Sequence, residues 1–168
     1  MNKVAQFEKV SFKQFLDSVN GLILPEDTIR RMYDAIPIPT RATVGSAGYD
    51  FSLPFGIELE PGRSILIPTG IRCKMDNDWV LMLAPRSGLG FKFRLQLNNT
   101  VGIIDSDYYN SDNEGHIMAK IMNDSNEGKV ISLPAGKAFM QGVFLPYGIT
   151  VDDNASGIRN GGFDSSGK

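Results

Sequence analysis

The stretch APRSGLGFK gathers residue types that bind anions. It places Arg86, Ser87 and Lys92 close together, directly after a run that reads as the end of a strand. Arginine can bind phosphate oxygens through two N–H groups, serine can donate one more hydrogen bond, and Gly88 and Gly90 would let backbone N–H groups approach closely. The segment predicts a phosphate cradle, although a basic turn with incidental glycines would have the same sequence.

The next stretch, LNNTVGIIDSDYY, ends in two carboxylates and two tyrosines. It reads as two short β runs that turn about Thr100 to Gly102, and a continuing strand would put Asp105 and Asp107 on one face. Acidic pairs also occur in calcium loops, but counting Asp105 as the first loop position puts Asn110 where glycine is needed and His116 where a bidentate glutamate is needed. The acidic pair is therefore interpreted as serving a water or an ion–phosphate site.

Histidine and cysteine are almost absent, which restricts the possible chemistry. His116 is the only histidine and Cys73 the only cysteine in the chain. Ser-His-Asp and Cys-His nucleophiles and a Cys/His zinc site are therefore poorly supported, and the lone thiol suits a reducing cytoplasm. If the chain is an enzyme, its general base is expected to be a carboxylate.

Two further segments each carry one polar residue that could support a site. In GSAGYDF, Asp50 follows a turn of small residues, where Gly45, Ala47 and Gly48 leave room for another backbone to pack closely. In GKAFMQGVF, Gln141 interrupts an apolar strand, and a buried amide needs hydrogen-bond partners. A plain turn and a glutamine satisfied inside the core would explain the same two patterns.

The tail RNGGFDSSGK combines groups that a nucleotide needs. Arg159 and the hydroxyl of Ser165 could bind phosphates, two glycines could offer backbone donors, and Phe163 could stack on a base. A disordered tail would look similar. Because the tail is rich in glycine and serine and has no periodicity, residues 156–168 are expected to be a mobile lid over the active site.

Length and charge limit what the whole chain can be. With 168 residues it is long enough for one domain with its own core. Lys plus Arg number 17 against 19 for Asp plus Glu, a net charge of −2, which argues against broad binding to nucleic acid or to an anionic membrane. No signal peptide or membrane-spanning run is evident in the sequence, so we expect a cytoplasmic protein.

The elements that position these residues change character at Pro37. Residues 7–35 have apolar residues at helical spacing and a helix start at PEDTIRRMYDAI, so residues 1–36 are predicted to be a helical extension used for packing. Residues 37–155 consist of short apolar runs cut by Gly, Pro, Asn and Asp, which predicts an all-β domain. Because the runs at 80–83 and 117–121 are apolar almost throughout, both faces of those strands are expected to be covered, either in a packed jelly roll or at a subunit interface.

The order of the segments resembles one family. GSAGYDF, PRSGLGFK, NNTVGIIDSDYY, FMQGVF and RNGGFDSSG follow the order of the five motifs of trimeric dUTPases, from about Pro37 to Lys168. The second and third motifs are the specific ones, with 12 residues from Ser87 to Asn99 and six more to Asp105. The resemblance implies a distorted β jelly-roll barrel in a homotrimer, with each active site shared between chains.

The resemblance also implies an activity and a set of roles. The chain would hydrolyse dUTP to dUMP and pyrophosphate with Mg2+, which limits uracil incorporation into DNA and supplies dUMP for dTMP synthesis. Asp105 would activate the attacking water, Tyr108 would lie against the deoxyribose, and Asp50 would support the metal, which is held by substrate phosphates and waters rather than directly by protein. The implied substrate-binding residues are Arg86, Ser87, Gly88, Asn99, Gly102, Ile104, Tyr108, Gln141, Arg159, Phe163 and Ser165.

The chain departs from the family pattern, and two other functions remain open. Ala138 stands where the fourth motif usually has arginine, with Lys137 adjacent, Asp164 stands where the tail usually has glycine, and the loop after Tyr108 is long. The related dCTP deaminases share the architecture but lack the sequence from Asp105 to Tyr108 together with a GGF tail. A regulatory binder on the dUTPase scaffold, with an unidentified protein partner at residues 1–36 or 109–115, is the other alternative.

Overall fold

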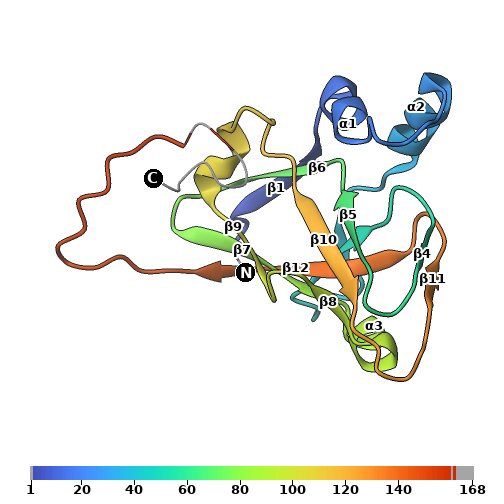
Figure 1. Cartoon of the computed structure of the whole chain (residues 1–168). Coiled ribbons are helices and arrows are strands. Elements are labelled where there is room, and N and C mark those ends of the chain that lie inside the picture. The colour runs from blue at the N-terminus through green and yellow to red at the C-terminus, as the bar shows by residue number, and fades with distance from the viewer. Residues whose placement is uncertain (1, 160, 162–168) are drawn as a thin grey trace.

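The computed structural model describes residues 2–159 and 161, and short strands make up most of it (Figure 1). The strands are β1 Ala5–Lys9, β2 Thr40–Arg41, β3 Tyr49–Ser52, β4 Ile57–Leu59, β5 Ser64–Pro68, β6 Ile71–Met75, β7 Trp79–Pro85, β8 Leu95–Leu97, β9 Gly102–Ile104, β10 Met118–Asn123, β11 Ile131–Leu133 and β12 Ala138–Pro146. The helices are α1 Phe12–Ser18, α2 Glu26–Ala35, α3 Ser87–Phe93 and the 3-10 helix η1 Ser106–Asn110. The predominance of β-structure after Pro37 confirms the sequence prediction.

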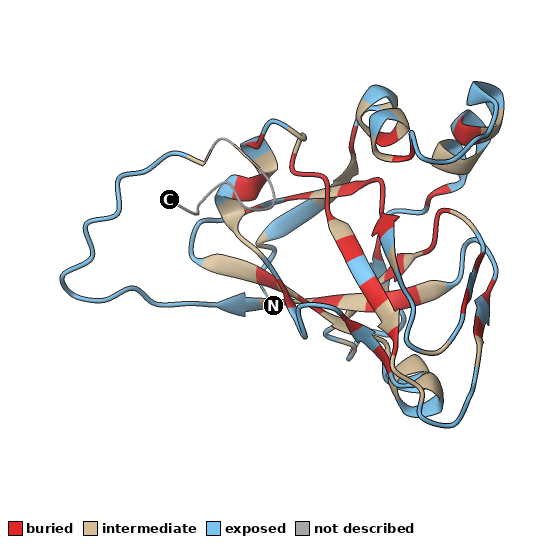
Figure 2. Cartoon of the chain, viewed as in Figure 1, coloured by how far each residue is buried: buried red, intermediate tan, exposed pale blue. Residues whose placement is uncertain are grey.

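The strands form four small antiparallel sheets that share one core. The largest has the order β2-β3-β12-β7-β9, a second has the order β5-β10-β8, and β1 with β6 and β4 with β11 form two pairs. On most strands one set of side chains is buried, and along strands such as β10 buried residues alternate with exposed or half-buried ones, as the colours in Figure 2 show. Phe51, Leu81, Ile121 and Phe139 are among the fully buried side chains.

The apolar runs were expected to be covered on both faces, but within one chain only one face is covered. Along β7, Leu81 and Leu83 are buried while Val80 and Met82 are only half-buried. Within β10, Lys120 is exposed between buried neighbours. The outward side chains of these strands thus remain accessible in the single chain.

The N-terminal segment is not the helical extension that the sequence predicted. Residues 5–9 form β1, which pairs with β6 in the register Ala5 to Met75. Two short helices do follow, and α2 begins after Pro25 as expected, with acidic residues in its first turn. The prediction extended the helical spacing of the later residues too far toward the N-terminus. Residues 5–9 form a strand instead because they pair with β6.

This N-terminal segment belongs to the core rather than being appended to it. Phe15 of α1 is fully buried, and Val19 and Ile29 are almost fully buried. Gly70, in the turn between β5 and β6, has φ +72, and a Cβ there would lie 2.5 Å from Cδ1 of Ile36. The turn therefore needs glycine both for its backbone conformation and for the close packing of the N-terminal segment.

The turn after Asn99 differs from a simple hairpin. β8 pairs with β10 and β9 pairs with β7, and only the isolated bridge of Leu97 to Thr100 joins the two arms. β9 ends at Ile104, and the chain then enters η1. The expectation that Asp105 and Asp107 share a strand face was therefore wrong, because the two residues lie at the start of a 3-10 helix.

The chain leaves β12 as an exposed arm. Residues 145–158 are exposed throughout, including Ile149, Val151 and Ile158, and they pass outward before returning toward η1 (Figures 1 and 2). In the part of the chain that the structure describes, no helix has the length and apolar character needed to cross a membrane.

Candidate active site

A cleft of about 760 Å³ lies between α3, β3 and β12. Asp50, Arg86, Ser87, Gly88 and Gln141 line it, as the sequence analysis predicted for a phosphate site. Two lysines also line it: Lys92, which belongs to the predicted phosphate cradle, and Lys137, which was noted only as the neighbour of Ala138. Lys137 lies in the segment GKAFMQGVF that also carries Gln141, and this closeness to an assigned residue could have indicated it.

Sheet pairing brings the polar residues of the cleft together. Asp50 of β3 and Gln141 of β12 are direct cross-strand partners. Arg86 follows β7, its N–H donates to the carbonyl of Phe139, and its Nε lies 3.2 Å from Oδ1 of Asp50. Both charged side chains are partly exposed, so solvent screens this ion pair. Its main consequence is to orient the guanidinium at the edge of the cleft.

Gln141 is not the satisfied core glutamine that the alternative reading proposed. Its side chain is half-buried and lines the cleft, and it has no hydrogen-bond partner among the described residues. A Cβ at Gly48 would lie 2.4 Å from Oε1 of Gln141. The Gln141 amide thus occupies space that a side chain at position 48 would fill. The amide is available to a ligand.

The basic segment after β7 forms a helix rather than a loop. Arg86 is the N-cap of α3, and its carbonyl accepts the N–H groups of Leu89 and Gly90. The N–H groups of Ser87 and Gly88 precede these bonds, and the first N–H groups of a helix have no partner within it. Both residues are exposed at the cleft, so backbone and hydroxyl donors are available to an anion there.

Asp105 lies apart from this cleft, as the N-cap of η1. Its side chain makes no capping hydrogen bond, so the fold does not use the carboxylate locally. Arg159 of the arm contacts it instead, with Nη2 at 2.5 Å from Oδ2 of Asp105 and Nε at 3.0 Å from Oδ1 of Asp107. Arg159 was expected near phosphates, and in the structure it contacts these two carboxylates.

The turn before Asp105 presents mainly backbone. Asn99 is exposed, its carbonyl accepts the N–H of Val101, and Thr100 has φ 68. Gly102 lies opposite Leu83, and a Cβ at Gly102 would be 3.0 Å from that of Leu83. The tight approach of β9 to β7 therefore depends on glycine, and it fixes where the turn and Ile104 lie.

Tyr108 is held from the loop that follows η1. Its hydroxyl donates to the carbonyl of His116 at 2.8 Å, and the side-chain amide of Asn113 donates to the same hydroxyl at 2.8 Å. Burial raises the pKa of Tyr108 and lowers that of His116 to about 4. Both residues are therefore neutral near pH 7, and the tyrosine ring has a fixed place beside Asp105.

The predicted site residues form two groups, and Asp105 lies at the opposite end of β7 from the cleft. Gln141 pairs with Ala84, whereas Ile104, which precedes Asp105, pairs with Leu81. Asp105 is then level with Val80, four residues or about 13 Å along the strand from the level of Gln141. The cleft group contains Asp50, Arg86, Ser87, Gly88 and Gln141, and the η1 group contains Ile104, Asp105, Tyr108 and Arg159. The turn residues Asn99 and Gly102 lead into η1 from nearer the cleft end, since Gly102 pairs with Leu83, which also pairs with Gly142.

Comparison with known proteins identifies the family. Residues 34–167 match the family model for dUTPase. The chain belongs to the dUTPase family. It is 42% identical over 135 residues to the deoxyuridine 5'-triphosphate nucleotidohydrolase of Lactococcus lactis subsp. lactis, which covers 79% of this chain and 89% of that relative.

Solved dUTPases have a similar fold. The crystal structure of dUTPase from Streptococcus mutans superposes with a TM-score of 0.60 at 39% identity, covering 67% of this chain and 88% of that one. A dUTPase from phage phi11 of S. aureus, described with a coordinated structural Mg(II) ion, superposes with a TM-score of 0.63 at 18% identity and covers 92% and 98% of the two chains. The phage protein supports the fold alone.

Two assigned residues of the dUTPase tail cannot be placed. Phe163 and Ser165 lie outside the described residues, as does most of the predicted lid. Among the residues that line the cleft, Lys137 was not predicted from the sequence as part of the site. Glu8 of β1 and Arg72 of β6 contact Tyr109 of η1. No local sequence pattern indicates these contacts, because the partners lie far apart in the sequence.

Proposed function

We propose that this dUTPase family member hydrolyses dUTP to dUMP and pyrophosphate. The observation that carries the proposal is the chemical fit of the two residue groups. One group is a cleft whose cations Arg86, Lys92 and Lys137 face a single carboxylate, Asp50, which suits a triphosphate. The other supplies Asp105, a carboxylate that the fold leaves free of capping bonds.

The cleft group would bind the phosphates. Arg86 can donate two parallel N–H bonds to phosphate oxygens, and the Ser87 hydroxyl with the backbone of Gly88 can donate more at the start of α3. Gln141, whose amide is unpaired within the described residues, would complete the set. These donors share one cleft, and this supports a common ligand for them.

The η1 group would carry out the proton transfer and, together with Asn99 and Gly102 of the preceding turn, would recognise the nucleoside. Asp105 would accept a proton from a water as the water's oxygen bonds to the α-phosphorus, and the bond from that phosphorus to the bridging oxygen of pyrophosphate would break. The backbone of Gly102 and Ile104 with Asn99 would read uracil. The Tyr108 ring would exclude a 2′-hydroxyl.

The separation of the two groups supports an active site shared between chains of a homotrimer. The backbone levels of Gln141 and Asp105 are about 13 Å apart along β7 of one chain, so one nucleotide would reach both groups more easily if they came from different chains. Exposed apolar side chains on the outer strands, including Leu66 and Ile103, also suit coverage by another copy. In a trimer, the cleft of one chain would face η1 of its neighbour.

A magnesium ion fits this donor set only with help from the substrate. Within residues 2–159 and 161 no group of three metal-ligating side chains is present. Asp50 lines the cleft and offers a hard oxygen donor. Since Mg2+ prefers oxygen ligands and keeps several waters, substrate phosphates would hold it, with Asp50 in support, and the bound ion would offset phosphate charge.

The arm would act as a lid. Arg159 contacts Asp105 and Asp107, so a role on the phosphates would require its guanidinium to exchange these carboxylates for phosphates. Residues beyond Arg159 would cover the bound nucleotide, with Phe163 over the base and Ser165 on the phosphates.

Product analysis tests the function directly. The purified chain is incubated with dUTP, UTP, dCTP and dTTP, with and without Mg2+, and nucleotides, pyrophosphate and ammonia are quantified. Pyrophosphate from dUTP alone, dependent on Mg2+, is expected. Ammonia release from dCTP would assign the deaminase instead, and no turnover of any nucleotide would leave the regulatory binder as the better function.

A further inference from the structure

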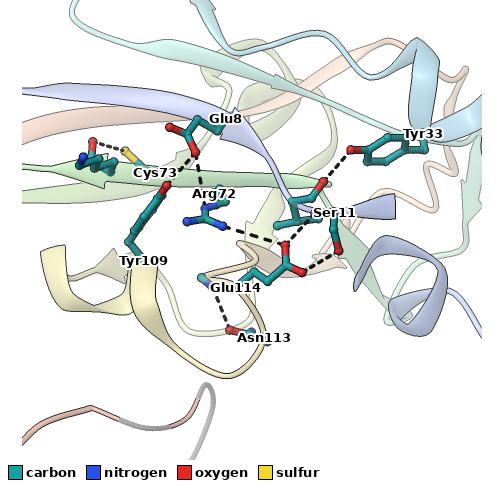
Figure 3. A network of polar contacts seen from close by, with 11 residues as sticks. Glu8, Ser11, Tyr33, Arg72, Cys73, Tyr109, Asn113 and Glu114 are labelled. Atoms are coloured by element: carbon teal, nitrogen blue, oxygen red, sulfur yellow. Dashed lines mark hydrogen bonds and ion pairs between the residues drawn. The ribbon is translucent and has the colours of Figure 1, made fainter. Parts of the chain in front are cut away.

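The loop after η1 and the N-terminal strand are joined by a polar network around Arg72 (Figure 3). Its members, called the Arg72 network below, are Glu8 of β1, Arg72 of β6, Tyr109 of η1 and Glu114 of the loop. Glu8 and Arg72 are direct partners in the β1–β6 pair. The network therefore connects the helix that Asp105 caps to the strand pair formed by the N-terminus.

Tyr109 forms the first connection. Its hydroxyl donates to Oε2 of Glu8 at 2.8 Å, across 101 residues of sequence. The Arg72 guanidinium stacks on its ring at 3.6 Å from the centroid. The bond to Glu8 and partial burial raise the pKa of Tyr109. The tyrosine thus remains protonated near neutral pH and continues to donate.

Glu114 forms the second connection. One carboxylate oxygen accepts the backbone N–H of Ser11 at 2.7 Å and the other accepts its hydroxyl at 2.6 Å. Ser11 is also the N-cap of α1, where its Oγ accepts the N–H of Gln14. Burial alone would raise the pKa of Glu114, but the Ser11 bonds and the charge of Arg72 outweigh it, and the pKa is lowered. The carboxylate is therefore charged and bound at both oxygens.

The loop returns tightly against η1. Glu114 has φ 59 and Gly115 has φ +68, so two successive residues adopt the left-handed conformation. A Cβ at Gly115 would lie 2.7 Å from both the carbonyl oxygen of Tyr108 and Cα of Tyr109. The anchored loop backbone is thus in direct contact with the backbone of η1.

The 3-10 helix cannot hold its own geometry. It has five residues, and Asp105 at its N-cap provides no side-chain cap. Short 3-10 helices have poor hydrogen-bond geometry, and a single turn is unfavourable in isolation. The strand before it, β9, has three residues and pairs only with β7. The direction of the Asp105 carboxylate therefore depends on tertiary contacts that hold η1 from its far end.

We propose that Tyr109 and Glu114 are positioning residues for the reaction, because the Arg72 network aligns η1 and hence the Asp105 carboxylate. The N-terminal strand is then part of the active-site scaffold. This inference rests on the proposed function, in which Asp105 is the base. It predicts a loss in turnover without an equal loss in binding, since the phosphate cleft lies at the other end of β7.

The test compares kcat and KM for dUTP in Glu114→Ala, Glu114→Gln and Tyr109→Phe. Glu114→Ala is expected to lower kcat by about 10-fold, because displacement of a catalytic group by a fraction of an ångström is costly. Glu114→Gln keeps one oxygen for the Ser11 N–H and should recover part of the loss. Both KM and the Kd for a non-hydrolysable imido analogue of dUTP should stay within about two-fold.

A stability control separates positioning from general weakening of the N-terminal segment. Val19→Ala removes buried volume at the end of α1 without touching the network, so it should lower Tm while kcat stays near the wild-type value. If Val19→Ala and Glu114→Ala lose kcat equally at matched loss of Tm, the network is structural only. If Glu114→Ala does not fold, Tyr109→Phe, which removes one hydroxyl, gives the same comparison.

The outcomes also separate this inference from the proposed function. A wild-type chain that releases no pyrophosphate from dUTP refutes the proposed function. An active wild type whose Glu114→Ala and Tyr109→Phe variants keep full kcat refutes the positioning role and leaves the function intact. An active wild type with reduced kcat and unchanged KM in these variants, but not in Val19→Ala, supports both.

Discussion

The two ends of β7 hold their functional residues by different means. At the cleft end, sheet pairing sets Asp50 opposite Gln141, and Arg86 follows directly after β7. At the η1 end, Asp105 caps a five-residue helix that is held by bonds from Tyr109 and Glu114 to residues 101 and 103 positions away. Side chains fixed by strands need few further contacts, whereas a side chain on a short helix depends on distant ones.

The largest difference between the ends should appear when Asp105 is changed to Asn. The amide cannot accept the water's proton, so kcat for dUTP should fall by at least about 10²-fold. Binding should survive because the phosphate donors lie at the other end of β7. Steady-state kinetics with a Kd for the imido analogue measure both quantities. Near-normal turnover would remove Asp105 from the role of base.

At the cleft end, Gly48→Ala should affect binding instead of turnover. The new Cβ would approach Oε1 of Gln141 to 2.4 Å, and the amide would have to move. Loss of one well-placed hydrogen bond should raise KM for dUTP by about 10-fold. Gly45→Ala is the matched control, since a Cβ there meets nothing within 4 Å. Equal KM values for the two variants would contradict the role of Gln141.

The η1 end should also be the source of pH-dependent stability between pH 7 and 5.5. Burial lowers the pKa of His116 to about 4 in the folded chain, while the unfolded value is near 6.5. As the pH falls from 7 to 5.5, His116 therefore takes up a proton in the unfolded chain but not in the folded chain. The free energy of unfolding of the protein should drop by about 1 kcal/mol over this range. Urea unfolding of the wild type and His116→Gln at both pH values measures this. The same slope in both proteins would exclude His116 as the source.

The smallest effects are expected from the two cleft lysines. Lys92→Ala and Lys137→Ala should each raise KM for dUTP by about three-fold, because each removes one partly exposed charge near the triphosphate. The increase should shrink as ionic strength rises. Lys129→Ala, which removes the lysine paired with Glu127 elsewhere on the surface, is the control. A salt-independent effect would indicate packing instead of charge.

The sequence predicted the cleft end better than the η1 end for a physical reason. Arg86, Ser87 and Gly88 are contiguous, and the strands around them have clear apolar runs and breaks. Their convergence with Asp50 and Gln141 comes from the pairing of β12 with both β3 and β7, and the resemblance to the family had already assigned these residues to one site.

The sequence could not predict the geometry after Ile104. A period of two residues suggested that Asp105 and Asp107 extend a strand, but β9 stops where its pairing with β7 ends. The same limit applies to β1, whose strand conformation comes from β6, 62 residues after its last residue. Nothing in the local sequence of Glu8 or Glu114 shows that each has a partner far away.

The pairing of the N-terminus with distant residues has a consequence for synthesis of the chain on the ribosome. Ser11 emerges 103 residues before Glu114, its partner. At roughly 5–20 residues per second, this corresponds to a delay of about 5–20 s. During that time β1 is an unpaired edge until β6 has been synthesised, and the β1–β6 pair then lacks its contacts to Glu114 until the loop has been synthesised. The end of the molecule that bears Asp105 therefore folds late, although part of its support is synthesised first.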